Sequence, residues 1–306
     1  MDDHCLQIKN LNKRICSNLA IEGLDLKLTR GKKVALLGLN GAGKSSFIRL
    51  LIGESKADSG DIHFRVNDHQ LAPNQVKFKS LLGNQADTML AIDQMKVKEY
   101  LTLCAKMKRM SNQAISSAID FVSRQWNIVN LLNLNLSNLS KGNLQKVTIA
   151  QAFIGNPTFL FFDEPCQNLD PLEQDRFNQN IKSLTNVELC LFSTHNVEQA
   201  IEIADEILLV HQANVIFHFN LRSKKNYVVK FKKIYEDIQS IFEQLSLENM
   251  KIANGFYLLI EPNVDELKEF NLIAENKRLE IDFCLLEEQS VIPIFRLLAS
   301  GELFLV

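Results

Sequence analysis

One short segment constrains the fold of this chain more than any other. Residues 38–45, Gly-Leu-Asn-Gly-Ala-Gly-Lys-Ser, fit the pattern GxxxxGK[ST] of a phosphate-binding loop. The loop follows the apolar run KVALLGL at 33–39 and precedes KSSFIRLLIG, in which Phe47, Leu50 and Leu51 recur at helical spacing. A buried strand, a glycine-rich turn and a helix, in this order, are the context that the motif requires. The pattern therefore predicts an α/β core built around a phosphate site.

The residue types in this loop suit a bound nucleotide. Glycines let backbone N–H groups converge on phosphate oxygens, and the helix N-terminus adds its dipole. Lys44 supplies a positive charge near the β- and γ-phosphates, and Ser45 offers a hydroxyl to Mg²⁺. The alternative, a glycine-rich turn with a surface lysine, is disfavoured by the complete motif and its context. The predicted nucleotide-binding residues of the loop are Gly38, Asn40, Gly41, Ala42, Gly43, Lys44, Ser45 and Ser46.

A second strand candidate, TFLFF at 158–162, ends in the acidic pair Asp163 and Glu164. Such a strand carries carboxylates to the carboxyl edge of a parallel sheet, where the ligands of α/β folds bind. Asp163 can hold Mg²⁺ through water, and Glu164 can polarise an attacking water. Taken alone, the segment is better explained by two acids at the start of a loop. Together with the phosphate loop, the catalytic interpretation is the stronger one.

The rest of the chain shows an alternating organisation. LCLFS at 189–193 is a third strand candidate, and helical patterns lie between the strands, which favours a mainly parallel sheet covered by helices. Two amphipathic helices, VKEYLTLCAKMKRM and AISSAIDFVSRQW, interrupt this alternation. We therefore expect an α/β domain over residues 1–220 with an inserted helical subdomain at about 86–140.

The pattern changes again after residue 220, where we expect a smaller domain over residues 221–306. Its Asn254-Gly255 pair is a strong hairpin signal because both residues tolerate positive φ. The expected order is strand YVVKF, helix IYEDIQSIFEQL, strands MKIA and FYLLIE, helix VDELKEFNLIAENK, strand LEIDFCLL and helix IFRLLAS. A β-α-β-β-α-β order predicts a ferredoxin-like α+β plait.

This second domain has no phosphate loop or acidic pair, so contact with another protein is its expected role. Apolar positions earlier in the domain are expected to form its own core. The terminal helix and tail remain for contact, because an apolar tail in water is unusual for a monomer. The residues in question are Ile294, Phe295, Leu297, Leu298 and the segment 303–306.

Composition narrows the classes of partner and location. The 34 Lys and Arg residues nearly balance the 36 Asp and Glu residues, so nucleic acid is not an expected partner. The six cysteines form no CxxC pair, which fits a reduced cytosol. No apolar run approaches the ~20 residues of a membrane helix. We expect a cytoplasmic protein that does not span a bilayer by itself.

A further motif, Leu139-Ser140-Lys141-Gly142-Asn143, lies shortly before the acidic strand. Together these motifs make most of residues 1–215 resemble the ATP-binding-cassette (ABC) ATPases, whose signature is normally LSGGQ. Alone, Ser140 would be an ordinary helix cap. The resemblance implies that Ser140 and Gly142 meet the γ-phosphate of ATP bound to a second subunit.

The resemblance also assigns roles to residues outside the phosphate loop. Gln85, in LLGNQ, matches the glutamine of the Q-loop, which senses Mg²⁺. Asp170 matches the aspartate of the D-loop, and His195, at the end of LCLFSTH, matches the switch histidine. Glu164 and His195 would then be catalytic, with ATP and Mg²⁺ as cofactors. The implied metal-holding residues are Ser45, Gln85 and Asp163.

Three departures from the family pattern stand out. Lys141 and Asn143 are tolerable polar changes in the signature, and Cys166 replaces the threonine of the usual DEPT segment. Ile15 occupies the position of an aromatic residue that stacks on adenine. Because base stacking contributes ~1–3 kcal/mol, we expect weaker nucleotide affinity and base selectivity.

The resemblance implies the ATP-hydrolysing subunit of an ABC transporter, peripheral on the inner face of the cell membrane. Two subunits, as a homodimer or pseudo-dimer, would close on two ATP molecules and drive separate transmembrane permease subunits. The second domain loosely resembles the appended domain of drug, lipid and polysaccharide exporters, which favours export. The alternative is a soluble family member without a transport role. Ribosome-acting relatives usually carry two cassettes, and repair relatives carry coiled coils or zinc clusters, whereas this sequence has one cassette and neither addition.

Overall fold

The computed structural model describes residues 4–67, 69–85, 94–221, 227–232, 235, 238–245, 249–253, 256–259, 264–277 and 279–300. The chain divides into two compact units, Met1–Phe217 and His218–Val306, and each is considered by itself.

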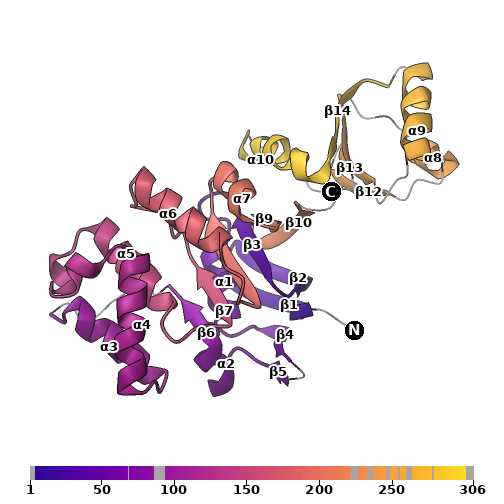
Figure 1. The fold of residues 1–306 in the computed structure, drawn as a ribbon. Helices are drawn as coiled ribbons and strands as arrows, with labels where there is room; N and C mark the ends of the chain where they lie inside the picture. Colours follow the sequence, from indigo (N-terminus) through magenta and orange to yellow (C-terminus); the bar gives the residue numbers. More distant parts are fainter. Residues whose placement is uncertain are drawn as a thin grey trace. The chain divides into compact units, whose positions relative to one another are not determined.

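A six-stranded sheet forms the centre of the first unit, with the strand order β10-β9-β3-β8-β7-β6 (Figure 1). Its pairings from β9 through β6 are parallel. The strands expected at 33–39, 158–162 and 189–193 are confirmed, and their apolar runs are buried, as in a sheet covered on both faces. The strands are β3 (Lys32–Leu37), β6 (Leu82–Asn84), β7 (Phe159–Phe162), β8 (Leu189–Thr194), β9 (Glu206–His211) and β10 (Asn214–Asn220).

A second, antiparallel sheet in the first unit was not predicted. Its order is β2-β1-β4-β5, formed by β1 (His4–Cys16), β2 (Leu19–Thr29), β4 (Ser59–Val66) and β5 (His69–Leu71). Two of its pairings, β1–β2 and β4–β5, join strands that follow each other in the chain, and the β1–β4 pairing that unites them is long-range. Helix α1 (Lys44–Leu51) shares one buried apolar cluster with both sheets. In that cluster Phe64 of the antiparallel sheet meets Phe159 of the central sheet, with ring centroids 5.0 Å apart. This packing holds the helix that begins at Lys44.

The helical subdomain joins the central sheet through aromatic packing. Trp126 lies against Phe153, with centroids 5.1 Å apart, and Phe177 packs edge-on against Phe162 of β7. Residues 86–93 of the predicted insert lie outside the described residues. The helices of the first unit after α1 are α2 (Val76–Leu81), α3 (Val97–Met107), α4 (Asn112–Gln125), α5 (Lys141–Ala152), α6 (Pro171–Lys182) and α7 (Val197–Ile203), with short 3-10 turns at Val129–Leu131 and Leu136–Asn138.

The second unit contains an antiparallel sheet with the order β12-β13-β11-β14. We interpret its β-α-β-β-α-β order as the expected plait; the Asn254-Gly255 turn lies outside the described residues. Phe231, Phe242 and Phe270 belong to its core. The elements are β11 (Tyr227–Phe231), α8 (Ile238–Gln244), β12 (Asn249–Ala253), β13 (Phe256–Leu259), α9 (Val264–Asn276), β14 (Ile281–Leu286), a 3-10 turn (Glu287–Ser290) and α10 (Val291–Ser300).

The terminal helix corrects one expectation. Ile294, Phe295 and Leu298 of α10 are buried, so they do not form a free apolar patch. The side chain of Leu297 and residues 303–306 lie outside the described part of the chain. Within the described residues, no helix is both long and apolar enough to cross a membrane.

Candidate functional site

The predicted phosphate loop joins β3 to α1 at the carboxyl edge of the central sheet. Gly43 caps α1 with a φ of 98°, a left-handed conformation that glycine adopts without strain. A Cβ on Gly43 would lie 2.8 Å from Cα of Ala213, in the turn between β9 and β10. The Ala213 N–H donates to the Ala42 carbonyl at 2.7 Å, and the Gly38 N–H donates to the Thr194 carbonyl at 3.3 Å. The loop is therefore fixed from two neighbouring strands.

Lys44 is the charged centre of this loop. Its side chain is only 6% exposed, and its Nζ donates to the carbonyls of Gly38 at 2.8 Å and Leu39 at 3.1 Å. The same Nζ lies 3.2 Å from Glu164 Oε1. Ser45 and Ser46 follow in the first turn of α1 and are half-buried, whereas Asn40 and Gly41 at the tip of the loop are exposed. A buried ammonium at a helix N-terminus is suited to bind a phosphate.

Glu164 connects the phosphate loop to His195. Its carboxylate Oε2 lies 3.0 Å from His195 Nδ1 at the end of β8. Its backbone has a φ of 45°, which residues with side chains rarely adopt, and its N–H donates to Ser193 Oγ at 2.8 Å. Glu164, Lys44 and His195, which stand far apart in the sequence, thus meet at the ends of three strands.

Three oxygen-bearing side chains surround a small cavity beside the loop. Ser45, Gln85 and Asp163 all line it. The Oε1 atom of Gln85 is buried and has no hydrogen-bond partner among the described residues, although its backbone is fixed by a bond from its N–H to the Phe161 carbonyl at 3.0 Å. Asp163 accepts a hydrogen bond from Ser193 Oγ. A hydroxyl, an amide oxygen and a carboxylate are the hard ligands that Mg²⁺ prefers, so these residues fit that ion.

The signature residues lie at the start of α5. The Ser140 hydroxyl caps the helix by accepting from the Asn143 N–H at 3.2 Å, and Ser140 itself is exposed. A Cβ on Gly142 would lie 2.6 Å from the Asn168 carbonyl oxygen, so α5 approaches the D-loop segment closely. Asp170 caps α6, accepting from the Glu173 N–H at 3.0 Å. The hydrogen bonds of the described residues do not join Ser140 to the phosphate loop of its own chain.

Sequence reasoning missed one residue that links these segments. Gln145, in the second turn of α5, donates through Nε2 to the carbonyls of Pro165 at 2.9 Å and Glu164 at 3.3 Å. Only its place two residues after the signature motif hinted at this contact. Gln145 thereby ties the signature helix to the acidic strand.

Ile15 lies near the end of β1, half-buried and packed against the apolar cluster between the two sheets. Its side chain is thus committed at least in part to the core. The described contacts do not bring it to Lys44, and its predicted effect on nucleotide binding stays a prediction.

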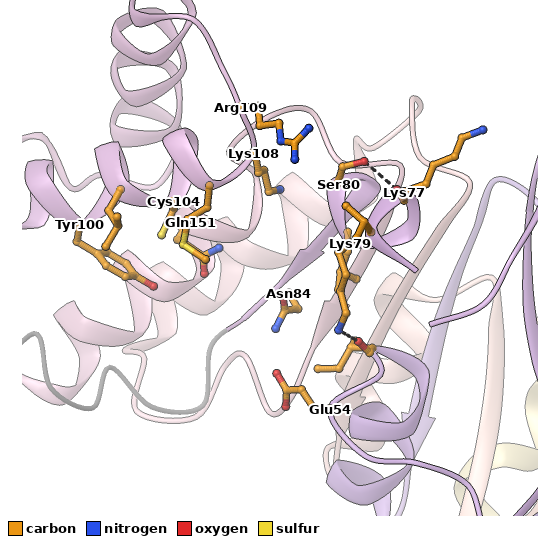
Figure 2. A pocket seen from close by; sticks show the side chains of 15 residues that line it. Glu54, Lys77, Lys79, Ser80, Asn84, Tyr100, Cys104, Lys108, Arg109 and Gln151 are labelled. Atoms are coloured by element: carbon orange, nitrogen blue, oxygen red, sulfur yellow. Dashed lines mark hydrogen bonds between the residues drawn. The ribbon is translucent and has the colours of Figure 1, made fainter. Parts of the chain in front are cut away.

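A larger groove, with a volume of about 790 Å³, lies between α2 and β6 on one side and α3 and α5 on the other. Figure 2 shows Glu54 and Lys79 on one wall, with Tyr100 and Lys108 on the other. Two of the apolar side chains along it, Val76 and Met107, are 77% and 76% exposed.

Among the described residues that line the groove, positive charge is in excess, because Lys77, Lys79, Lys108 and Arg109 are accompanied by one acid, Glu54. Lys79 Nζ donates to the Ile52 carbonyl, and Lys108 Nζ donates to the Ile154 carbonyl at 2.6 Å. Burial lowers the pKa of Lys108 to about 8. Asn84 lines both this groove and the small Ser45–Asp163 cavity, so the two adjoin.

Known proteins share this architecture. Residues 21–167 match the family model described as "ABC transporter". The chain is 27% identical to the ABC transporter ATP-binding protein YhaQ of Bacillus subtilis over 95% of this chain and 97% of that protein. It is 30% identical to the energy-coupling factor transporter ATP-binding protein EcfA1 of Mycoplasmopsis pulmonis, over 69% and 81% of the two chains. A solved structure of a dimeric ATP-binding cassette, in a post-hydrolysis state bound to ADP and Pi, shares the fold. Its TM-score is 0.63 at 20% identity, over 71% of this chain and 99% of that one.

Proposed function

This chain belongs to the family of ABC transporter ATP-binding proteins, whose members bind and hydrolyse ATP, and we propose that it drives export through separate membrane subunits. The observation that carries its catalytic part is the meeting of Lys44, Glu164 and His195 at the carboxyl ends of β3, β7 and β8. This edge of a parallel sheet is where α/β folds bind their ligands.

In the proposed reaction, Lys44 and His195 bind the γ-phosphate, and Glu164 orients the attacking water or accepts its proton. The backbone N–H groups of the loop bind the other phosphates. Ser45, Gln85 and Asp163 would hold Mg²⁺, which neutralises charge on the phosphate oxygens. The present pairing of Glu164 with Lys44 and His195 supports these roles, since the Lys44 ammonium and the His195 ring already converge on one carboxylate.

We place the second half of each nucleotide site on another subunit. Ser140 is exposed at the N-terminus of a 12-residue helix, where N–H groups and the helix dipole favour an anion. A second copy, or a related cassette, would bring its Ser140 and Gly142 to the γ-phosphate held by Lys44. ATP would then close the dimer, and hydrolysis would reopen it.

The groove between α2 and α3 is the proposed contact with the membrane subunit. It combines exposed apolar side chains with basic ones, and it adjoins the cavity that contains Gln85. A change at Gln85 on nucleotide binding can therefore reach the groove over a short path. The chain would lie peripherally on the inner face of the cell membrane, and the appended second unit favours export as the direction.

A capture experiment tests the transport role. Glu164→Gln, held in ATP, is used as bait in detergent-solubilised membranes, and Lys44→Ala serves as the ATP-free control. We expect both baits to recover a polytopic membrane protein. The amount of membrane protein recovered per bait should differ between the ATP-bound variant and the ATP-free control. Recovery of no membrane protein with either bait, while the purified wild-type protein hydrolyses ATP, would instead support the soluble role.

A further inference from the structure

The spacing between Glu164 and His195 is not fixed by the sheet. The β7–β8 ladder ends at the pair Phe162–Phe192, before either catalytic side chain is reached. Beyond this point the two strands no longer pair with each other. β7 ends at Phe162 and Glu164 has a positive φ, whereas β8 continues along β3 as far as Thr194. Since β7 and β8 do not pair beside these residues, side-chain bonds between the two segments help to set the 3.0 Å distance between the Glu164 carboxylate and the His195 imidazole.

Ser193 provides one such bond, because it accepts from the Glu164 N–H at 2.8 Å. Gln199 of α7 provides further bonds near the Glu164–His195 pair, and it is only 9% exposed. Its Oε1 accepts from Thr194 Oγ1 at 2.8 Å, and Thr194 directly precedes His195. Its Nε2 donates to Cys166 Sγ at 2.7 Å, and Cys166 follows Glu164 by two residues. One amide thus joins both catalytic loops.

We propose that Gln199 is a positioning residue for ATP hydrolysis, which holds the loops of Glu164 and His195 in register through Cys166 and Thr194. This inference rests on the proposed catalytic roles of Glu164 and His195. The hydrogen bonds of Gln199 to described residues reach Thr194, Cys166, Asn178 and Asn196 and neither catalytic side chain, so it acts through its neighbours.

The chemistry of the position favours an amide over other side chains. Gln199 accepts one hydrogen bond and donates two, the second reaching Asn178 Oδ1 at 3.3 Å. Asn178 cannot simply reverse its amide, because its Nδ2 donates to Glu202 Oε2 at 2.9 Å. A carboxylate at position 199 would therefore face the Asn178 oxygen, and an alkyl group would leave buried partners unsatisfied.

The Cys166 thiol in this network also keeps one protonation state. Burial raises the pKa of the Cys166 thiol to about 12, so the thiol stays neutral at physiological pH. Gln199 is itself anchored, since its N–H donates to Asn196 Oδ1 at the start of α7 at 2.9 Å. Buried networks with satisfied members hold one geometry, which is what a positioning residue must do.

The test compares Gln199→Leu with Gln179→Leu, a matched substitution at an exposed position of α6. In the full chain, Gln199→Leu should lower kcat roughly tenfold to a hundredfold, as a small misplacement of catalytic groups does. ATP affinity should stay within about twofold, because the phosphate loop is untouched. Gln179→Leu should change neither value.

A merely structural role is separated by repeating Gln199→Leu in a His195→Ala background. Because His195→Ala already removes the Glu164–His195 pair, the added Gln199→Leu should cause almost no further loss of the residual ATPase rate, measured at high protein concentration. A loss that repeats in full there, or a wild-type kcat in the single variant, overturns the proposal.

If Gln199→Leu fails to fold, Cys166→Ala carries the test, because it removes one bond of the network at a less buried position. The kcat of Cys166→Ala should fall by a smaller factor than the kcat of Gln199→Leu, and it should fall only when His195 is present. An unchanged kcat would overturn the proposal. Wild-type activity of His195→Ala alone would instead refute the proposed role of His195, and this inference with it. An inactive His195→Ala with a fully active Gln199→Leu refutes only the inference.

Discussion

The ammonium of Lys44 lies 3.2 Å from the carboxylate of Glu164, so the proposed phosphate-binding cation and the proposed catalytic base are paired with each other. A γ-phosphate would compete with Glu164 for this cation. On that basis, ATP binding itself would release the carboxylate to orient water. Hydrolysis and binding are thereby linked through one ion pair.

Glu164→Gln should remove most hydrolysis while keeping ATP bound. The amide cannot act as a base, and we expect kcat to fall by at least about a hundredfold. Because the neutral amide competes less for Lys44, ATP affinity should be unchanged or tighter, and an ATP-bound dimer should accumulate. Light scattering in ATP and steady-state ATPase assays measure both effects.

Lys44→Ala is the comparison for this prediction, and it should weaken ATP binding itself. Lys9→Ala, at an exposed position of β1, is the matched control. Near-wild-type turnover of Glu164→Gln would show that another group supplies the base.

Gln85→Ala should raise the Mg²⁺ concentration that half-maximal ATPase activity requires. The variant removes a buried amide oxygen that has no hydrogen-bond partner within the described part of the chain. Gln85→Glu restores an oxygen at the same reach and should need less Mg²⁺ than the alanine variant. A titration of Mg²⁺ at saturating ATP checks the order, and equal requirements in all three proteins would argue against a metal role for this residue.

Ile15→Tyr should tighten ATP binding if position 15 faces the base. Stacking on a ring contributes ~1–3 kcal/mol, which is about fivefold to a hundredfold in affinity. The native protein should also discriminate between ATP and GTP less than relatives that carry the ring. Titrations with both nucleotides decide this, and weaker ATP binding by the tyrosine variant would show that Ile15 serves only the core.

The groove predicts a pH effect on stability. Burial lowers the pKa of Lys108 from the ordinary 10.5 to about 8, so between these values the unfolded chain binds more protons than the folded one. Below pH 8 the full cost of burying the charge is present, and it is relieved as pH rises toward 10.5.

Urea unfolding of the wild type and Lys108→Met at pH 7 and pH 10 tests this. Between pH 7 and pH 10 the free energy of unfolding should rise more in the wild type than in the variant. Lys98→Met, at an exposed lysine of α3, should show no such change. A constant difference between wild type and Lys108→Met would mean that Lys108 stays charged at no cost.

Truncation after residue 220 should leave ATP binding intact, because β10 and the whole central sheet are retained. Dimerisation, or stimulation by a membrane subunit, should weaken, since the second unit has no nucleotide site of its own. Light scattering and ATPase assays on the shortened chain measure this. Unchanged values in both would assign the second unit another role.

The sequence was most informative where function depends on local spacing. The loop that ends in Lys44 and Ser45 is contiguous, so its strand, turn and helix could be read directly. The antiparallel sheet was missed because β1 pairs with β4 across more than fifty residues, and pairings at that distance leave little trace in a local pattern. Gln145 and Gln199 were missed for a related reason: a glutamine has no periodic signature, and its role appears only once distant loops are brought together.

The terminal helix shows the opposite error. Ile294 and Phe295 were expected to be available for a partner because the earlier apolar positions seemed enough for the core of the second unit. Both side chains are buried. Counting apolar residues along the chain cannot tell how many of them a small sheet needs to cover it.

The closeness of Gly43 to Ala213 also limits how this site can evolve. The two positions belong to different strands' loops, yet neither can enlarge without displacing the other, since a Cβ at 43 already meets Ala213. A bulkier residue at position 213 of the β9–β10 turn should press on the phosphate loop at Gly43. Variation at position 213 across related chains should therefore be confined to small residues, even though no motif records it.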